Sequence, residues 1–290
     1  MSPASTAETA TLLRAAGSLL PQREVRGPDT LAAYMLPWRL SVRTLVKVPG
    51  LRALIVNAVR RRKPGALWFE LVRTRYMDDI LLQEIRQGAD QVVILGAGFD
   101  SRAHRMRADL QDVVVYEVDR PALSQRKQAR VRSLPAADVR YVTIDFNDGN
   151  LHRVLSDRGF DPTRRTIVIW SGVVPYLKQR GVEATLRWLA AQSPGSSIVF
   201  DYCWQEVLDD PGQIPEADEA MRDVASRGEP WLSGIPRGTA ASFVHAFGLS
   251  VVEDLDLADG QARYLTLPNG ARQGPIWTFG GFVHACVPSS

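Results

Sequence analysis

An apolar strand that ends in a glycine turn constrains this chain more than any other feature. Residues 91–95 form a run of β-forming residues, which breaks into Gly96-Ala97-Gly98. Glycine has no side chain, so a ligand can lie against bare backbone there, and the amides that begin the next helix face the same point. By itself, the pattern predicts a site for a nucleotide-like ligand.

Strands and helical stretches alternate after this turn. Such alternation is typical of right-handed βαβ units, which build a parallel sheet with helices on both faces. The further strands are expected at 112–118, 139–144, 165–170, 196–202, 249–255 and 281–287, with the clearest helices at 121–133 and 178–192. The last strand is expected to pair antiparallel, at or near the sheet edge. We therefore predict an α/β fold: a doubly wound Rossmann-like sheet, mostly parallel, with a helical cap.

The chain of 290 residues is long enough for one large domain, or for one domain with a cap. From about Thr9 to Gly88 the pattern is helical and contains no convincing strand. We predict an N-terminal helical cap at 1–88 and an α/β domain at 89–290. Residues 203–240, rich in proline, glycine and acidic residues, are expected to form an insertion that completes the cap.

Composition argues against several classes of partner. The net charge is +3, and the densest basic cluster, residues 60–63, is interpreted as a solvated helix end rather than a nucleic-acid or lipid surface. Cys203 and Cys286 lack metal-ligand spacing, so we expect reduced thiols and no metal. No leader pattern or long apolar run is present. The expectation is a cytoplasmic protein without nucleic-acid or membrane partners.

Ligands of open α/β sheets bind beyond the carboxyl ends of the strands. Three further strand ends carry polar or aromatic residues, namely Glu117 and Asp119, Asp145 and Phe146, and Trp170 and Ser171. Glu117 and Asp119 alternate onto one face, where both can accept hydrogen bonds from ribose hydroxyls. Asp145 suits an exocyclic amine, and Phe146 suits the face of a purine. Each residue alone has an ordinary structural explanation, but their order along an alternating chain indicates a nucleoside site.

The glycine turn also indicates which nucleoside binds. A dinucleotide fingerprint reads G-x-G-x-x-G, whereas this chain has Ser101 at the third glycine position. Asp100 lies where a pyrophosphate would sit, and a carboxylate beside two phosphates is unfavourable. Beside the sulfonium and ammonium of S-adenosylmethionine the same carboxylate is favourable. The turn therefore favours S-adenosylmethionine over NAD.

Several segments together resemble a known family. The segments are Arg73 to Asp79 (RTRYMDD), LGAGFDSRAHRM, YEVDRP, IDFND and the G-x-x-x-YL ending at Leu177. They are similar to the leucine carboxyl methyltransferase-like S-adenosylmethionine-dependent methyltransferases, a group abundant in actinobacteria. The resemblance covers roughly Thr9 to Leu257 and is dense between Arg73 and Leu177. It implies a class I methyltransferase sheet.

The resemblance also implies residue roles. Arg73 would hold the carboxylate of the cofactor's methionine moiety, and the turn of Gly96, Ala97 and Gly98 would approach the cofactor through its backbone. Asp119, with Glu117, would serve the ribose. Asp145 and Phe146 would flank the adenine. The strand ends themselves, apart from the resemblance, add Trp170 at the lip of the site as a cofactor contact.

One position departs from the family pattern. The family usually has a glutamate before the glycine of the fourth strand, and this chain has Ser171 there. The substitution removes a negative charge beside the cofactor and the methyl acceptor, so a carboxylate acceptor meets less repulsion. Methyl transfer requires alignment of the acceptor oxygen with the methyl carbon, and a hydroxyl acceptor also benefits from a base. The candidate catalytic residues are Ser171, Tyr202, His245 and Tyr176, the last as an orienting hydroxyl.

Asp201 and His104 are also candidate bases. For His104, which follows the glycine turn, a structural role is expected instead. Cap residues are expected to line an acceptor pocket: the aromatic residues Tyr34, Trp38, Trp68, Trp204 and Trp231, and the basic residues Arg39, Arg43 and Arg75, which would meet an anionic acceptor. The G-E-P-W segment at 228–231 is expected to act as a mobile lid.

These expectations lead to an S-adenosylmethionine-dependent O-methyltransferase. Its acceptor would be a carboxylate or an enolic or phenolic hydroxyl of a small molecule in bacterial secondary metabolism. Two alternatives stay open. One is a methyltransferase-fold enzyme that uses the cofactor structurally for cyclisation or rearrangement, and the other is a non-catalytic binding module. The sequence also allows a homodimer, paired through the last strand or the N-terminal helices.

Overall fold

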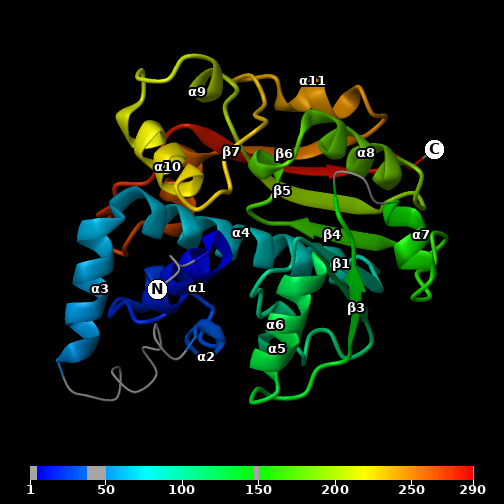
Figure 1. Cartoon of the computed structure of the whole chain (residues 1–290), viewed down its shortest axis with the longest axis horizontal. Coiled ribbons are helices and arrows are strands. Elements are labelled where there is room, and N and C mark those ends of the chain that lie inside the picture. The colour runs from blue at the N-terminus through cyan, green and yellow to red at the C-terminus, as the bar shows by residue number, and fades with distance from the viewer. Residues whose placement is uncertain (1–4, 38–49, 147–149, 290) are drawn as a thin grey trace.

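The central sheet follows the predicted alternation. The computed structural model describes residues 5–37, 50–146 and 150–289, and within them seven strands pair in the order β3-β2-β1-β4-β5-β7-β6 (Figure 1). The strands are β1 Gln91–Leu95, β2 Val114–Asp119, β3 Val139–Thr143, β4 Thr166–Trp170, β5 Ser197–Cys203, β6 Ser250–Asp256 and β7 Gly280–Cys286. Strands β1 to β5 pair in parallel, whereas β7 pairs antiparallel with both β5 and β6. The predicted fold class is confirmed.

Burial explains why the strands read as they do in the sequence. Every residue of β1, β4 and β5 is buried, as expected of central strands covered on both faces. The edge strands β3 and β6 contain exposed residues instead. Strand β7 lies one place in from the edge, so the prediction that it pairs antiparallel near the edge is confirmed.

Helices cover both faces of the sheet. The helices are α1 Thr6–Gly17, α2 Ala32–Met35, α3 Leu51–Arg62, α4 Pro64–Arg86, α5 Arg102–Arg105, α6 Pro121–Val131, α7 Leu151–Ser156, α8 Gln179–Ala190, α9 Glu206–Asp209, α10 Pro215–Ala225, α11 Ala240–His245 and α12 Leu257–Tyr264. Helices α7, α8 and α11 share one hydrophobic cluster with the strands. Helices α4, α5 and α12 share the cluster on the opposite face. Among the described residues, no helix is both long and apolar enough to cross a membrane.

The N-terminal helices pack directly onto the sheet. Helix α4 contacts β4 and β5, and its apolar residues belong to the same cluster as residues of β1 and β4. The segment at 203–240, expected as an irregular insertion, contains α9 and α10. The division of the chain at residue 88 stays a prediction.

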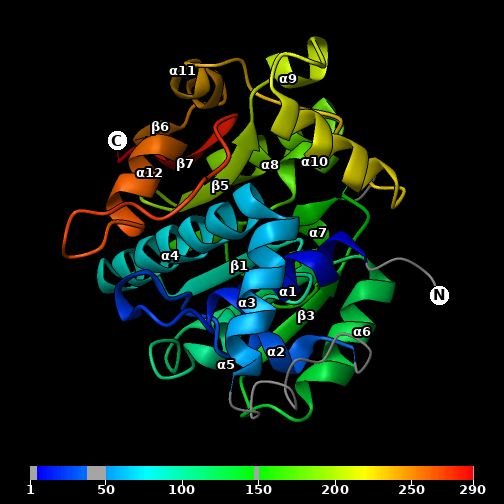
Figure 2. The same cartoon turned by 90° about the vertical axis from the view of Figure 1, so that its left-hand side faces the viewer.

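Three helices gather at one end of the sheet. Figure 2 looks onto this end, where α1, the start of α4 and α10 stand in front of the strands. Residues of all three helices and of the strand ends line one cavity.

Candidate functional site

A cavity of about 460 Å³ lies at the carboxyl ends of the parallel strands. Its lining combines the turns after β1, β2, β4 and β5 with α1, α4, α10 and the segment at 227–232. This position is the usual ligand site of open α/β sheets. The cavity therefore lies where the sequence predicts the site.

The glycine turn after β1 forms the floor of one half of the cavity. Gly96 and Gly98 have φ angles of +62° and +47°, in the left-handed region that side chains disfavour. A Cβ on Gly96 would also lie 2.3 Å from Cγ2 of Val173. The turn is fixed to the neighbouring strand, because the amide of Gly98 donates to Oδ2 of Asp119 at 2.6 Å. The backbone conformation thus favours glycine at both positions, and at Gly96 the lack of space for a Cβ requires it as well.

Asp119 lines the cavity at the end of β2. Its second oxygen accepts from the amide of Arg120 at 2.7 Å. Burial raises the pKa of Asp119, although the two backbone donors oppose the shift. The side chain is therefore held rigidly where it can meet a ligand that crosses β1 and β2.

A buried guanidinium marks the middle of the cavity. Arg73 of α4 donates from Nη1 to Oδ2 of Asp201 at 3.0 Å, and its Nη2 pairs with Glu70. Burial alone would lower the pKa of Arg73, but the two carboxylates outweigh burial and raise it. Nε of Arg73 is buried and has no hydrogen-bond partner among the described residues. Two of the five N–H donors of Arg73 hold the carboxylates, so the guanidinium that lines the cavity keeps further donors.

Asp201 ties this cluster to the end of β4. Its Oδ1 accepts from the amide of Gly172 at 2.6 Å. Gly172 has a φ of +67°, and a Cβ there would lie 2.6 Å from Nη1 of Arg73. The parallel register that pairs Trp170 with Phe200 brings Asp201 beside this turn. The sequence indicates Asp201 only as a candidate base, because its positioning role depends on contacts with Arg73 and Gly172 that are distant in the chain.

Two other charged residues of the cluster were missed. Glu70 lies three residues before Arg73, a spacing that brings side chains together on a helix and that the sequence shows. Arg14 of α1 joins the cluster, with Nη1 at 3.4 Å from Glu70 and Nε at 2.9 Å from Asp29. No local pattern pairs Arg14 with residues so distant, so only the tertiary structure reveals it.

Asp100 lines the cavity beside the glycine turn, as the sequence indicates. Its Oδ1 accepts from the amide of Arg102 at 2.7 Å, and its Oδ2 pairs with the Arg102 guanidinium. Burial would raise the pKa of Asp100, but Arg102 and Lys127 outweigh it and lower the pKa. The carboxylate is therefore ionised at neutral pH.

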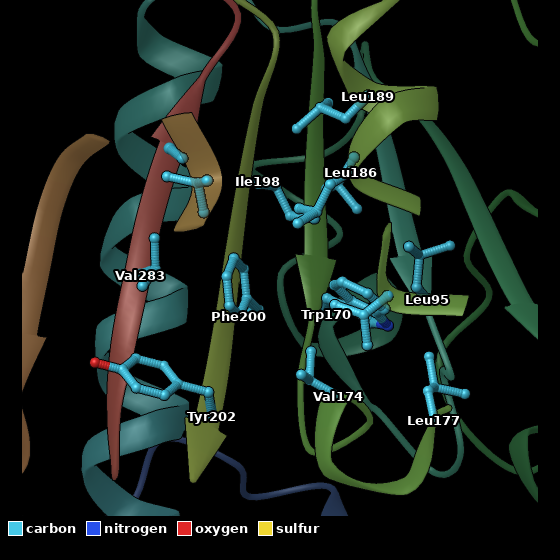
Figure 3. Packing of buried hydrophobic residues seen from close by; sticks show 14 of the residues in the cluster. Leu95, Trp170, Val174, Leu177, Leu186, Leu189, Ile198, Phe200, Tyr202 and Val283 are labelled. Carbon is cyan, nitrogen blue, oxygen red and sulfur yellow. The ribbon is translucent and has the colours of Figure 1, made fainter. Parts of the chain in front are cut away.

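Two predicted cofactor residues lie outside the lining of the cavity. Glu117 is buried beneath it and contacts Lys127 of α6 at 2.6 Å. Trp170 is fully buried in the hydrophobic cluster, where Figure 3 shows it beside Val174. Strand alternation placed Glu117 on the correct face but could not show that a lysine neutralises it there. Asp145 and Phe146 do line the cavity, and residues 147–149 lie outside the described residues.

The four candidate catalytic residues separate into two groups. Ser171 and Tyr176 line the cavity at the end of β4, and burial raises the pKa of Tyr176 to about 12. Tyr202 borders the cavity, and Figure 3 shows its ring extending from β5 across β7. Its hydroxyl donates to Oδ1 of Asp254 on β6 at 3.2 Å. His245 is exposed at the end of α11 and lies outside the lining. The structure thus places His245 away from the cavity and the Tyr202 hydroxyl against β6, and a catalytic role for any of the four residues stays a prediction.

The structural role assigned to His104 fits its surroundings. The ring is buried, and Nδ1 lies 2.9 Å from the carbonyl oxygen of Pro135. Burial lowers the pKa of His104, so the ring is neutral at physiological pH.

The acceptor pocket differs from the predicted aromatic and basic cap. Trp231 lines the cavity, whereas Trp68 and Trp204 are buried elsewhere and Tyr34 is exposed. Arg75 donates to the carbonyl oxygens of Glu24 and Arg26, so its role is structural. The remaining predicted cap residues, Trp38, Arg39 and Arg43, lie outside the described residues.

Other aromatic residues replace the predicted ones. Phe69 of α4 and Trp277 and Phe279 of the segment before β7 form, with Trp231, a wall of the cavity. The ring centroids of Phe69 and Trp277 are 5.0 Å apart, and those of Trp277 and Phe279 are 5.2 Å apart. We call these four residues the aromatic wall.

The segment at 228–231 covers the cavity, as expected of a lid. Glu229 accepts from the amide of Thr6 at 3.1 Å and pairs with Arg120 at 3.1 Å. The amide of Leu232 donates to the carbonyl oxygen of Pro175 at 2.6 Å. The segment thus joins α1, the end of β2 and the turn after β4 above the site. Its mobility stays a prediction.

Comparisons with known proteins agree with this geometry. The sequence model of the family described as leucine carboxyl methyltransferase matches residues 7–190. A Mycobacterium marinum protein that is named as a candidate S-adenosyl-L-methionine-dependent methyltransferase is 36% identical to this chain over 160 residues. The match covers 54% of this chain and 48% of that protein. A protein of the same name from Mycobacterium sp. strain KMS is 33% identical over 208 residues. That match covers 68% of this chain and 66% of the relative. The chain thus spans about half the length of the first of these relatives.

A solved structure shares the fold. A DUF574 family protein from Streptomyces avermitilis superposes with a TM-score of 0.57 at 17% identity, covering 82% of this chain and 91% of that one. The family match spans more than half of the chain and includes the glycine turn, Asp119 and the β4 turn. The chain therefore belongs to the leucine carboxyl methyltransferase family.

Proposed function

We propose that this chain is an S-adenosylmethionine-dependent methyltransferase that methylates an oxygen of a small molecule, a carboxylate or an enolic or phenolic hydroxyl. One observation carries the proposal. A single cavity joins the glycine turn and Asp119, over β1 and β2, to the aromatic wall, which lies toward β5 and β7. Cofactor and acceptor would meet between these halves, at the end of β4.

The lining residues fit S-adenosylmethionine. The guanidinium of Arg73, which lines the cavity, suits the carboxylate of the methionine moiety, and Asp119 suits the ribose hydroxyls. Asp145 and Phe146 lie at the rim, where the adenine would rest. The ionised carboxylate of Asp100 disfavours the pyrophosphate of NAD. The family and the names of the relatives support the same cofactor.

The chain contributes positioning more than acid–base chemistry. When bound, S-adenosylmethionine supplies an electrophilic methyl group. Ser171 and Tyr176 border the point between the two halves, where their hydroxyls can orient an acceptor oxygen. With its pKa raised to about 12, Tyr176 stays protonated and donates a hydrogen bond rather than taking a proton. The aromatic wall and the segment at 228–231 line the same cavity, where they would hold the acceptor in line with the methyl carbon. Such alignment supplies much of the rate of a displacement.

The first experiment tests cofactor and transfer separately. Calorimetric titration with S-adenosylhomocysteine and with NAD should give binding of the first alone, and tight binding of NAD alone would contradict the cofactor assignment. Incubation with S-adenosylmethionine carrying a deuterated methyl group and a panel of aromatic acids and phenols should give labelled product together with S-adenosylhomocysteine. Mild alkali then distinguishes a methyl ester, which hydrolyses, from a methyl ether, which does not.

The same assay separates the alternatives. Product without S-adenosylhomocysteine would indicate cyclisation or rearrangement, and cofactor binding without any product would favour a binding module. A role in secondary metabolism, a cytoplasmic location and a homodimer stay predictions of the sequence.

A further inference from the structure

We propose that the acceptor is a planar aromatic molecule that carries a positively charged amino group. The inference rests on the proposed function, because it names the substrate class of the same cavity. It also departs from the anionic acceptor that the sequence suggested. Three features of the part of the cavity next to the aromatic wall support the inference. They are the aromatic wall itself, the charge of α10, and the pairing of every lining cation with a carboxylate.

The aromatic wall is preorganised for a flat ring. Trp277 lies against α4, where a Cβ on Gly65 would come within 2.3 Å of the Trp277 ring. Phe69 is backed by Phe282, with ring centroids 5.7 Å apart. Trp231 stands nearly perpendicular to Trp277, at 82° and a centroid distance of 6.4 Å. Phe69 also lies under the guanidinium of Arg73, and Phe279 is buried, so the partly exposed rings of Trp231 and Trp277 are the ones that can meet an aromatic guest. The faces of such rings attract cations.

Helix α10 turns a charged face toward this wall. Its lining residues follow a helical spacing and are Glu216, Glu219, Ala220, Asp223 and Val224, continued by Arg227. Thr278, between the wall residues Trp277 and Phe279, donates to Oε1 of Glu216 at 3.2 Å. The hydrogen bond holds this exposed carboxylate at the edge of the wall, at the mouth of the cavity.

The cations of the lining are already paired. Within the described part of the chain, the basic lining residues are Arg14, Lys63, Arg73, Arg120 and Arg227, and each has a carboxylate partner. Lys63 and Arg227 both pair with Asp223, at 2.8 and 2.6 Å. No described cation pairs with Glu216 or Glu219. Glu216, Glu219 and Asp223 carry three negative charges against the two positive charges of Lys63 and Arg227. An anionic acceptor would thus meet net negative charge at α10, whereas an ammonium would be attracted by it and by the rings.

The test measures binding with three probes that share one ring. Tryptamine, tryptophol and indole-3-propionate carry a positive, a neutral and a negative group on the same two-carbon chain. Each is titrated by calorimetry into protein saturated with S-adenosylhomocysteine. We expect tryptamine to bind roughly five- to tenfold more tightly than tryptophol, and indole-3-propionate to bind most weakly. The aliphatic cation n-hexylamine should bind more weakly than tryptamine, because it cannot use the wall.

A matched pair of variants assigns the preference to α10. The double variant E216Q/E219Q should lose the preference for tryptamine while keeping its affinity for S-adenosylhomocysteine. The control D109N/D112N removes the same charge from exposed residues outside the cavity and should keep the preference. Raising the salt concentration should reduce the preference in the wild type and leave E216Q/E219Q unaffected.

Three results would overturn the inference. They are tighter binding of indole-3-propionate than of tryptamine, an unchanged preference in E216Q/E219Q, and no measurable binding of tryptamine. Failure of S-adenosylhomocysteine to bind in the initial titration would instead overturn the proposed function, so the two failures are distinguishable.

Discussion

Arg73 illustrates how the surroundings of one side chain decide its use. Its two terminal nitrogens are occupied by Glu70 and Asp201, so the guanidinium is fixed before any ligand arrives. Nε is also buried and has no hydrogen-bond partner among the described residues. Preorganisation of this kind reduces the entropy that a ligand loses when it binds.

The first prediction concerns the fork of donors on Arg73. Arg73→Lys keeps the charge but loses the planar donor geometry, so affinity for S-adenosylhomocysteine should fall roughly tenfold or more. The control is Arg75→Lys on the same helix, whose wild-type side chain holds backbone carbonyls and should matter for stability rather than binding. Calorimetric titration of both variants checks the prediction. Equal affinity in Arg73→Lys and the wild type would refute it.

A second prediction concerns the protonation of Tyr176. Because burial raises its pKa to about 12, the phenol is neutral throughout the range from pH 6 to pH 9. Tyr176→Phe should therefore lower kcat by roughly tenfold, the worth of one hydrogen bond, without changing the shape of the pH–rate profile. Loss of an ionisation from that profile in the variant would show instead that Tyr176 acts as the base.

Contacts between elements explain why some predicted site residues lie elsewhere. Glu117 of β2 and Lys127 of α6 are both buried and pair at 2.6 Å. Burial raises the pKa of Glu117 even though Lys127 opposes the shift. The pair links α6 to the sheet below the cavity, so Glu117 stabilises the packing of α6 against β2.

This pair gives a prediction about stability. Glu117→Gln leaves the Lys127 ammonium buried without a counter-charge and should lower the free energy of unfolding by about 3–5 kcal/mol. The double variant E117Q/K127M removes both charges and should recover most of that loss. Denaturant unfolding monitored by circular dichroism measures both changes. A double variant no more stable than Glu117→Gln would argue against the pair as the cause.

At the scale of the whole molecule, the cavity brings together segments from both ends of the chain. Thr6 and Ala7 of α1, the segment at 228–231 and Trp277 all line it. A ligand inside should therefore tie these segments together, although they are distant in sequence.

Hydrogen exchange provides the corresponding prediction. Saturation with S-adenosylhomocysteine should slow amide exchange in α1 and at residues 228–232, because opening either segment would release the ligand. Helix α11 lies outside the cavity lining and serves as the internal control. Mass spectrometry of exchanged peptides makes the measurement. Protection confined to the glycine turn would show that α1 and the 228–231 segment do not cover the bound ligand.

Some helices and strands could be predicted from the sequence, and others could not. Strand β1 has the bounds predicted for it, since a continuous apolar run followed by glycine leaves little choice. Helix α10 was not assigned, because its proline and acidic residues resemble a loop while only Ala217, Ala220 and Val224 are buried. Helix α12, at 257–264, was missed for a similar reason: its buried Leu257, Gly260 and Tyr264 give a weak apolar pattern.

By itself, the sequence determined the alternation of strands and helices, the glycine turn and the acids at the strand ends, because these depend on residues close together in the chain. Only the tertiary structure decided that Arg73 lies between Glu70 and Asp201, that Glu117 is neutralised by Lys127, and that Phe69, Trp277 and Phe279 join Trp231 in one wall. Charge pairing and cavity shape depend on which elements meet in space. Local patterns do not contain that information, because the partners lie far apart along the chain.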